Sequence, residues 1–262
     1  MTPFESYLSS AQKILHTVES QRQTIEQASA LLAKTILAGR MVHLFGSGHS
    51  RMMVEEMWPR YGSFPGFNPI VELSLSFHNL VVGANGQRQA MFLENVSGLA
   101  GRILRNYDLS AVDSAIIISS SGCNTVPVEM AEEFARHNIP VVAIVSLRHA
   151  RASVSRHPKQ VKLMDVAQIV LDTGAPVGDA MVHVEGLDTP VGPGSTLGGC
   201  LLVNGLKVEI AKRLTEAGQP PTVLTSGAVV GAERATELFE SAYDEHARRL
   251  AKLYANVGMS VS

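Results

Sequence analysis

Two short apolar runs in this chain each end abruptly in a loop of glycine and small polar residues, and a helix-favouring stretch follows each loop. Residues 41–45 lead into Gly-Ser-Gly-His-Ser at 46–50, here called the first loop, and residues 115–118 lead into Ser-Ser-Ser-Gly-Cys-Asn-Thr at 119–125, the second loop. Such runs are typical of strands buried on both faces, and their alternation with helices is typical of a doubly wound, mainly parallel sheet. The pattern therefore predicts an α/β fold.

The remaining segments extend this prediction. Apolar residues at three- and four-residue spacings predict one or two helices over residues 4–38, which Gly39 ends. A third loop, Gly-Pro-Gly-Ser-Thr, occupies residues 192–196. Further helices are predicted at 51–57, 87–107, 126–137, 197–214 and 233–254, and further strands at 140–145, 169–172 and 181–184.

A chain of 262 residues is long enough for one main α/β domain with helical additions. We expect residues 1–40 to form an N-terminal helical segment and residues 41–215 the main domain. Residues 216–262 are expected to form a C-terminal arm and helix packed on that domain.

Composition limits the binding partners and the cellular location that can be expected. The formal net charge of −2 provides no broad field for nucleic acid or an anionic membrane, so neither is expected as a partner. Two cysteines, Cys123 and Cys200, are too few for a disulfide framework, and we find no secretory signal and no apolar stretch near the roughly 20 residues of a membrane helix. We therefore expect a cytoplasmic protein in which any anion is bound by local geometry.

Each loop has the form of an anion site. Where a glycine-rich turn joins a parallel strand to a helix, main-chain N–H groups converge at the positive end of the helix dipole, and a phosphate can bind there. The first loop adds two hydroxyls, and the second adds four hydroxyls and an amide. One such loop alone can equally be a turn with an N-cap, but two in one chain can face one crevice beyond the strand ends. Neither loop matches the Walker A or dinucleotide pattern, which disfavours a nucleotide.

These loops resemble those of the SIS (sugar isomerase) domain family, in particular a bacterial branch labelled phosphosugar or phosphoheptose isomerases. The resemblance rests on the first loop with Glu55 and Glu56, on the second loop, on Gly-Asp-Ala at 178–180 and on the third loop, and it covers residues 1–215. It implies a five-stranded parallel sheet, so that 41–215 becomes a phosphosugar-binding SIS domain. It also implies homodimers or homotetramers with sites between subunits.

The resemblance also implies site residues. Ser119, Ser121 and Thr125 would hold a phosphate, while Ser47 and Ser50 would line the sugar side. The third loop and its helix look like a segment of N-acetylmuramic acid 6-phosphate etherases. The full set of predicted phosphate- and sugar-binding residues is Ser47, Gly48, Ser50, Ser119, Ser120, Ser121, Gly122, Asn124, Thr125, Ser195 and Thr196.

An aldose–ketose isomerisation needs a base that moves a proton between adjacent carbons and an acid that serves the oxygens. Glu56, in the helix after the first loop, is the predicted base, although a solvated helix face explains it equally well. His49, within the first loop, is the predicted partner, with a polar turn residue as the alternative. His78 and Glu94 flank a segment that could cover the site, and Asp179 could bind a hydroxyl or orient a loop, but surface and capping roles fit these three residues as well.

The sequence thus predicts a phosphosugar-binding protein, with aldose–ketose isomerisation as the leading activity. A lyase acting on an amino sugar phosphate and a noncatalytic sugar phosphate sensor are the alternatives. Cys123 is expected to fill space rather than react. No cofactor is predicted, and histidine spacing shows no compact metal motif, which leaves a divalent metal open.

Overall fold

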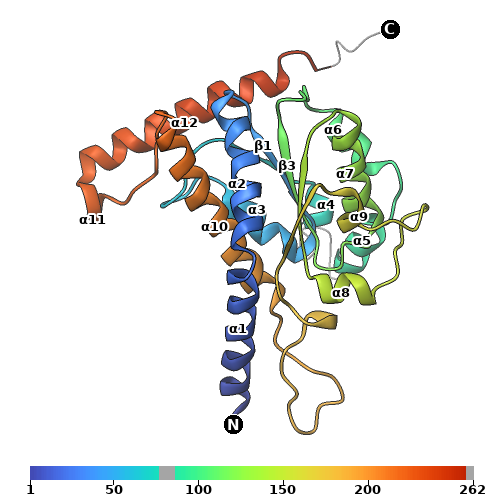
Figure 1. Ribbon diagram of the computed structural model, residues 1–262. Coiled ribbons are helices and arrows are strands. Elements are labelled where there is room, and N and C mark those ends of the chain that lie inside the picture. The colour runs from blue at the N-terminus through green and yellow to red at the C-terminus, as the bar shows by residue number, and fades with distance from the viewer. Residues whose placement is uncertain (77–85, 258–262) are drawn as a thin grey trace.

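The computed structural model describes residues 1–76 and 86–257 (Figure 1). Five strands form one sheet in this part of the chain, in the order β2-β1-β3-β4-β5, and every pair is parallel. The strands are β1 (Val42–Gly46), β2 (Phe67–Ile70), β3 (Ser114–Ile118), β4 (Val141–Val145) and β5 (Ile169–Asp172). The α/β fold and its parallel sheet are therefore confirmed.

Helices lie on both faces of the sheet (Figure 1). In the described residues they are α1 (Pro3–Glu19), α2 (Arg22–Leu37), α3 (Arg51–Met57), α4 (Leu73–Ser76), α5 (Gly86–Leu93), α6 (Leu99–Leu104), α7 (Thr125–Arg136), α8 (Leu147–Ala152), α9 (Leu163–Val166), α10 (Ser195–Glu216), α11 (Gly227–Val230) and α12 (Ala232–Tyr254), with short 3₁₀ turns η1 (Gly48–Ser50) and η3 (Val177–Asp179). The pair α1 and α2 confirms helical structure over residues 4–38.

A buried cluster lies on each face of the sheet, because alternate side chains of a strand point to opposite faces. Leu44 and Ile116 pack with α2, α3 and α10 in one buried cluster. Phe45 and Ile117 pack with α6 and α7 in the other. Both faces of β1 and β3 are thus buried, which is why both strands are mostly apolar, with His43 in β1 and Ser114 at the start of β3 as buried polar exceptions.

Two sequence predictions differ from the structure, and one strand was missed. Residues 181–184 do not form a strand of the sheet; Val182 makes only an isolated antiparallel bridge to Val191. Residues 87–107 do not form one helix, because Gly98, at φ +85°, separates α5 from α6. Strand β2 was not predicted, since its sequence Phe-Asn-Pro-Ile lacks an apolar run; its proline is tolerated because β2 is an edge strand.

A buried ionic network lies at the amino-terminal edge of the sheet. Asp113, whose side chain is fully buried, accepts from Arg40 Nε at 2.7 Å and lies 3.3 Å from His43 Nε2. Asn68 Nδ2 lies 3.0 Å from His43 Nδ1. Burial by itself would raise the pKa of Asp113, but hydrogen bonds from Arg40 and His43 outweigh it and lower the pKa. The network ties β1 and β2 to the residue before β3.

Helix α12 crosses the same edge and caps α2 (Figure 1). Arg249 Nη1 donates to the carbonyls of Ile36 at 3.1 Å and Arg40 at 2.8 Å, and Lys252 Nζ donates to that of Gly39 at 3.0 Å. Cations are favourable at a helix C-terminus, where carbonyls lack helical partners.

The division into segments 1–40, 41–215 and 216–262 stays a prediction. No helix in the described ranges combines the length and apolar character needed to cross a bilayer.

Candidate functional site

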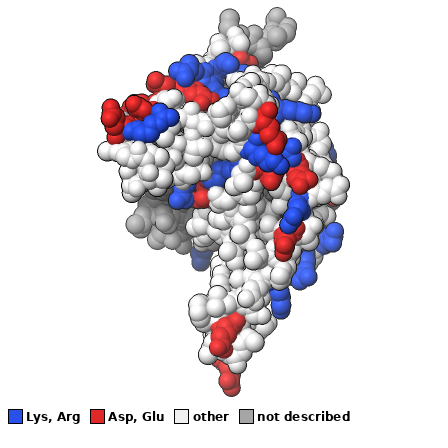
Figure 2. Space-filling view, turned by 60° about the vertical axis from the view of Figure 1, so that its left-hand side comes forward, with Lys and Arg blue, Asp and Glu red and all other residues white. Residues whose placement is uncertain are grey.

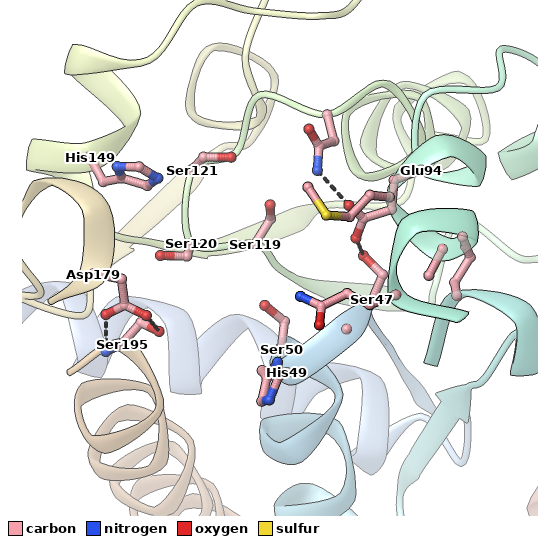
Figure 3. A pocket seen from close by; sticks show the side chains of 16 residues that line it. Ser47, His49, Ser50, Glu94, Ser119, Ser120, Ser121, His149, Asp179 and Ser195 are labelled. Atoms are coloured by element: carbon pink, nitrogen blue, oxygen red, sulfur yellow. Dashed lines mark hydrogen bonds between the residues drawn. The ribbon is translucent and has the colours of Figure 1, made fainter. Parts of the chain in front are cut away.

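The strand order places the predicted loops together. Strands β1 and β3 are neighbours, and the chain runs from β1 to β2 on one side and from β3 to β4 on the other. In such a sheet a crevice opens beyond the carboxyl ends of the two central strands, where the first and second loops lie. A cavity of about 420 Å³ occupies this place (Figure 3). Its lining residues are Ser47, Gly48, His49, Ser50, Leu75, Gln87, Ala90, Met91, Glu94, Ser119, Ser120, Ser121, Asn124, His149, Asp179 and Ser195.

All three predicted loops contribute to this cavity. Of the predicted site residues, Ser47, Gly48, His49, Ser50, Ser119, Ser120, Ser121, Asn124 and Ser195 line it. Gly122, Thr125, Thr196 and Glu56 are not among its lining residues. His78 lies outside the described residues.

The first loop brings a serine against a carboxylate. Ser47 is buried, and its hydroxyl donates to Glu94 Oε1 (Figure 3). Gly46 is required for the turn, because a Cβ there would lie 2.8 Å from the carbonyl oxygen of Ser50. Gly48 has φ +55°, a conformation that glycine adopts readily. The two glycines thus let the chain turn sharply from β1 into η1 at the cavity wall.

The second loop turns at Gly122, which has φ +61°. The hydroxyls of Ser119 and Ser121 accept from the main-chain N–H groups of Gly122 at 3.2 Å and Cys123 at 3.3 Å. The Ser120 hydroxyl is buried and has no hydrogen-bond partner among the described residues. A buried polar atom without a partner is unfavourable, and at a cavity wall it indicates a ligand that supplies the missing bond.

Of the residues at the end of the second loop, Asn124 lines the cavity and Thr125 does not. Thr125 is buried, and its hydroxyl donates to the carbonyl of Arg156 at 3.1 Å. The amide of Asn124 donates to Glu94 Oε2 at 2.6 Å. The Val126 N–H, in the first turn of α7, donates to the Glu94 carbonyl at 2.8 Å. Glu94 is therefore fixed by both the first and the second loop.

Glu94 lies immediately after the end of α5, in the segment that separates α5 from α6. Its backbone N–H closes the last turn of α5 on Ala90 at 2.9 Å, and its side chain then points between the two loops (Figure 3). From the sequence, Glu94 was expected only to flank, with His78, a segment that could cover the site. The sequence feature that could have indicated a role for Glu94 in the site is Gly98, which interrupts the predicted helix four residues later.

The third loop is held by Asp179. One oxygen of this carboxylate accepts from the N–H groups of Gly194 at 3.0 Å and Ser195 at 2.7 Å, and the other accepts from the Ser195 hydroxyl at 2.6 Å. Asp179 thus caps the first turn of α10, where a negative charge is favourable. The amide and hydroxyl of Ser195 are engaged by a side chain of the protein itself.

His149, in α8 after β4, lines the cavity and was not singled out from the sequence. Its Nδ1 accepts from the Gly178 N–H at 3.0 Å. A neutral ring whose Nδ1 accepts carries its proton on Nε2. The signal that could have found it is its position, since it follows a predicted strand whose carboxyl end faces the same edge as the two loops.

Glu56 points into a different cluster. Its carboxylate accepts from Arg60 at 2.7 Å and from Asn204 at 3.2 Å, and it lies 3.8 Å from the buried Lys207 ammonium. Burial would raise the pKa of Glu56, but the hydrogen bonds from Asn204 and Arg60 and the charge of Lys207 lower it. The structure therefore does not bring the predicted base to the cavity.

Two further predictions concern reactivity and metals. The Cys123 thiol is buried, and burial raises its pKa, which disfavours the reactive thiolate. Within residues 1–76 and 86–257, no three His, Cys, Asp or Glu side chains lie close enough together to hold a metal ion.

Comparison with known proteins agrees with this architecture. The model of the SIS domain family matches residues 6–146, more than half of the chain. The UPF0309 protein BH3325 of Halalkalibacterium halodurans is 35% identical over 231 residues, which are 88% of this chain and 93% of the relative. The UPF0309 protein TTE0306 of Caldanaerobacter subterraneus is 32% identical over 248 residues, or 93% and 98% of the two chains.

A solved structure shares the fold. The structure of a phosphoheptose isomerase from Francisella tularensis superposes with a TM-score of 0.50 at 15% identity, over 81% of this chain and 100% of the other. The match to the family model spans β1, β3 and both loops that meet at the cavity. On the strength of that match and of these relatives, the chain belongs to the SIS domain family.

Proposed function

We propose that this protein binds a phosphosugar in the cavity and interconverts its aldose and ketose forms. The observation that carries the proposal is the buried, unpartnered hydroxyl of Ser120, between Ser119 and Ser121 at the end of β3. Three neighbouring hydroxyls at this place match the several acceptor oxygens of a phosphate group. Membership of the SIS family and the fold shared with a phosphoheptose isomerase support the same substrate class.

The phosphate is assigned to the second loop rather than to the first turn of α7. That turn has few donors to offer, because the Val126 N–H is bonded to Glu94 and Pro127 has no N–H. The sugar then extends from Ser119–Ser121 toward Ser47, Ser50 and Glu94, which line the rest of the cavity.

Glu94 takes the role of base in this proposal, in place of Glu56. Its carboxylate lines the cavity and is oriented by donors from Ser47 and Asn124. It would remove the proton from C2 of the aldose, while the C2–H bonding pair forms a C1–C2 double bond and the C1 oxygen takes a proton. Return of the carbon proton to C1, with loss of the proton from the C2 oxygen, gives the ketose.

His149 is the proposed acid, with His49 as the second histidine at the cavity. The Gly178 N–H holds the His149 ring so that Nε2 carries the proton. Nε2 would donate this proton to the C1 oxygen and take one back from the C2 oxygen as the ketose forms, which restores the neutral ring. Glu94 and His149 lie on opposite sides of the serines of the second loop (Figure 3). An acid and a base on two sides of one cavity can both face a substrate bound between them.

The test is solvent-deuterium incorporation at C2 of aldose and ketose phosphates with five to seven carbons, followed by NMR. Glu94→Gln is expected to slow exchange by about 10²- to 10⁴-fold while leaving phosphosugar binding intact. Glu56→Gln is the competing variant, and a loss confined to it would return the base role to Glu56.

The alternatives give different results in the same assay. Release of lactate from an amino sugar phosphate would establish a lyase, and stabilisation by phosphosugars without exchange or turnover would establish a sensor. If phosphorylated and unphosphorylated sugars bind equally well, the proposal is wrong. The expected homodimer or homotetramer and the cytoplasmic location stay predictions.

A further inference from the structure

The second loop lacks a charge that its proposed ligand requires. None of the side chains from Ser119 to Thr125 is ionic. A phosphate monoester carries close to two negative charges near neutral pH, because its second pKa is about 6. On the face shown in Figure 2, basic and acidic side chains lie side by side, and no broad field of one sign covers it. The formal net charge of the chain is −2, so a charge that compensates a phosphate in the loop has to come from side chains close to it.

A segment behind the loop meets this condition. Residues 156–163, here called the brace, bond to successive residues of the second loop. The N–H of Leu163 donates to the carbonyl of Gly122 at 2.8 Å, and that of Arg156 to the carbonyl of Cys123 at 2.8 Å. The hydroxyl of Thr125 donates to the carbonyl of Arg156 at 3.1 Å. The position of the brace relative to the loop is thus fixed by main-chain bonds.

Two cations of the brace are directed to the loop and its surroundings. Arg156 Nη1 donates to Asn124 Oδ1 at 3.2 Å, and the amide of the same Asn124 donates to Glu94 inside the cavity. Lys162 Nζ donates to the carbonyl of Ala150 at 2.6 Å. The Cys123 thiol, in the second loop, donates to the same carbonyl at 3.9 Å. Burial raises the pKa of this thiol; the charges of Lys162 and Arg156 oppose that increase, whereas the charge of Asp165 adds to it. Both cations therefore lie next to the second loop.

We propose that Arg156 and Lys162 supply the positive charge of the second loop and make the site selective for the dianionic form of a phosphate monoester. This inference rests on the proposed function, because it needs a phosphate in the loop. Neither cation lines the cavity, so each acts at a distance, and Arg156 also acts through Asn124. A third cation of the brace, Lys159, instead bonds Glu132 at 2.9 Å and has no part in the proposal.

The test measures the affinity of the full-length protein for inorganic phosphate by titration calorimetry. Arg156→Gln keeps a hydrogen-bond donor without the charge, and Arg156→Lys keeps the charge without the guanidinium. Arg156→Gln and Lys162→Met are each expected to weaken binding by about three- to tenfold, and Arg156→Lys to stay close to the wild type. Lys159→Met is the matched control and is expected to bind as the wild type does.

A second readout separates charge from structure. In the wild type, affinity for a phosphosugar such as fructose 6-phosphate should fall as the pH drops through about 6, where the ester becomes a monoanion. In the double variant Arg156→Gln/Lys162→Met, the decrease in affinity over this pH range should be smaller than in the wild type, while thermal unfolding stays cooperative. Added salt should weaken binding to the wild type more than to the double variant.

The outcomes distinguish this inference from the proposed function. Failure of the wild type to bind inorganic phosphate would overturn both. Wild-type binding with Arg156→Gln and Lys162→Met unchanged would overturn only the charge role. Equal losses in Arg156→Gln and Arg156→Lys would show that guanidinium geometry matters and would also overturn it.

Discussion

Buried polar groups at the two edges of the sheet differ in whether they have hydrogen-bond partners. At the amino-terminal edge, the Asp113 carboxylate is satisfied by Arg40 and His43, and Asn68 completes the set. At the carboxyl-terminal edge, the buried hydroxyl of Ser120 has no partner among the described residues. Satisfied groups stabilise the native state, whereas an unsatisfied group at a cavity wall needs a partner from outside. The first edge is thus built for stability and the second for binding.

One buried group at the first edge refines the comparison. The ring nitrogens of His246 find no partner among the described residues, yet the ring packs edge-on against Trp58 at 4.5 Å. Burial lowers the pKa of His246, which favours the neutral ring, and the ring packs as an aromatic side chain. An unpartnered polar atom therefore indicates a ligand when it also borders a cavity.

The largest effect is expected from Asp113→Asn. This variant leaves the Arg40 guanidinium without its buried counter-charge and should lower the free energy of unfolding by about 3–5 kcal/mol. The measurement is urea unfolding followed by circular dichroism near neutral pH. Glu237→Gln is the matched control, because its ion pair with Arg234 is exposed and should contribute no more than about 1 kcal/mol.

The same carboxylate gives a signed pH dependence. Since the folded-state pKa of Asp113 is lowered, its contribution is present above the ordinary carboxyl pKa and is lost as pH falls through the folded-state pKa. Acid unfolding of the wild type should therefore include a step that Asp113→Asn lacks. A stable Asp113→Asn protein with wild-type acid unfolding would break the assignment of this edge to stability.

A smaller effect is expected from Asp179→Asn, which tests whether a carboxylate at the cavity serves the fold or the ligand. Asparagine cannot accept from both the amides and the hydroxyl that Asp179 now binds at the start of α10. We expect a loss of about 1–2 kcal/mol in the free energy of unfolding. Phosphate affinity measured by calorimetry should stay within about twofold, and a loss of affinity without a loss of stability would make Asp179 a ligand contact.

The fold was predictable from the sequence because burial on both faces leaves a direct trace. Strand β5 has the predicted bounds, and β1, β3 and β4 lie within one residue of them. Edge strand β2 left no such trace, since its asparagine and proline interrupt the apolar run. The other edge strand, β5, keeps the apolar run Ile-Val-Leu and was predicted. A local pattern therefore reports a strand by its apolar run rather than by its place in the sheet.

The candidate site was predictable only in part, for a physical reason. Loop residues are placed by the strand they follow, so Ser47 and Ser119–Ser121 could be assigned locally. The direction of Glu56 depends on Asn204 and Lys207, about 150 positions away in the chain, which one helix cannot reveal. Glu94 and His149 likewise gain their places from contacts with distant segments.

The smallest effect on stability, and the most direct comparison of the two edges, comes from a pair of serine variants. Ser114, at the first edge, accepts from the Thr35 hydroxyl at 2.9 Å, so Ser114→Ala should lower the free energy of unfolding by about 1 kcal/mol. Ser120→Ala removes a hydroxyl that has no partner among the described residues and should leave stability unchanged or slightly increased.

Phosphate affinity should respond in the reverse order. If the Ser120 hydroxyl bonds the ligand, its removal should weaken inorganic phosphate binding by about fivefold, while Ser114→Ala binds as the wild type does. Calorimetry on both variants, beside urea unfolding of the same samples, checks the pair. Loss of stability without loss of affinity in Ser120→Ala would mean that this hydroxyl belongs to the fold, and the distinction between the two edges would then be wrong.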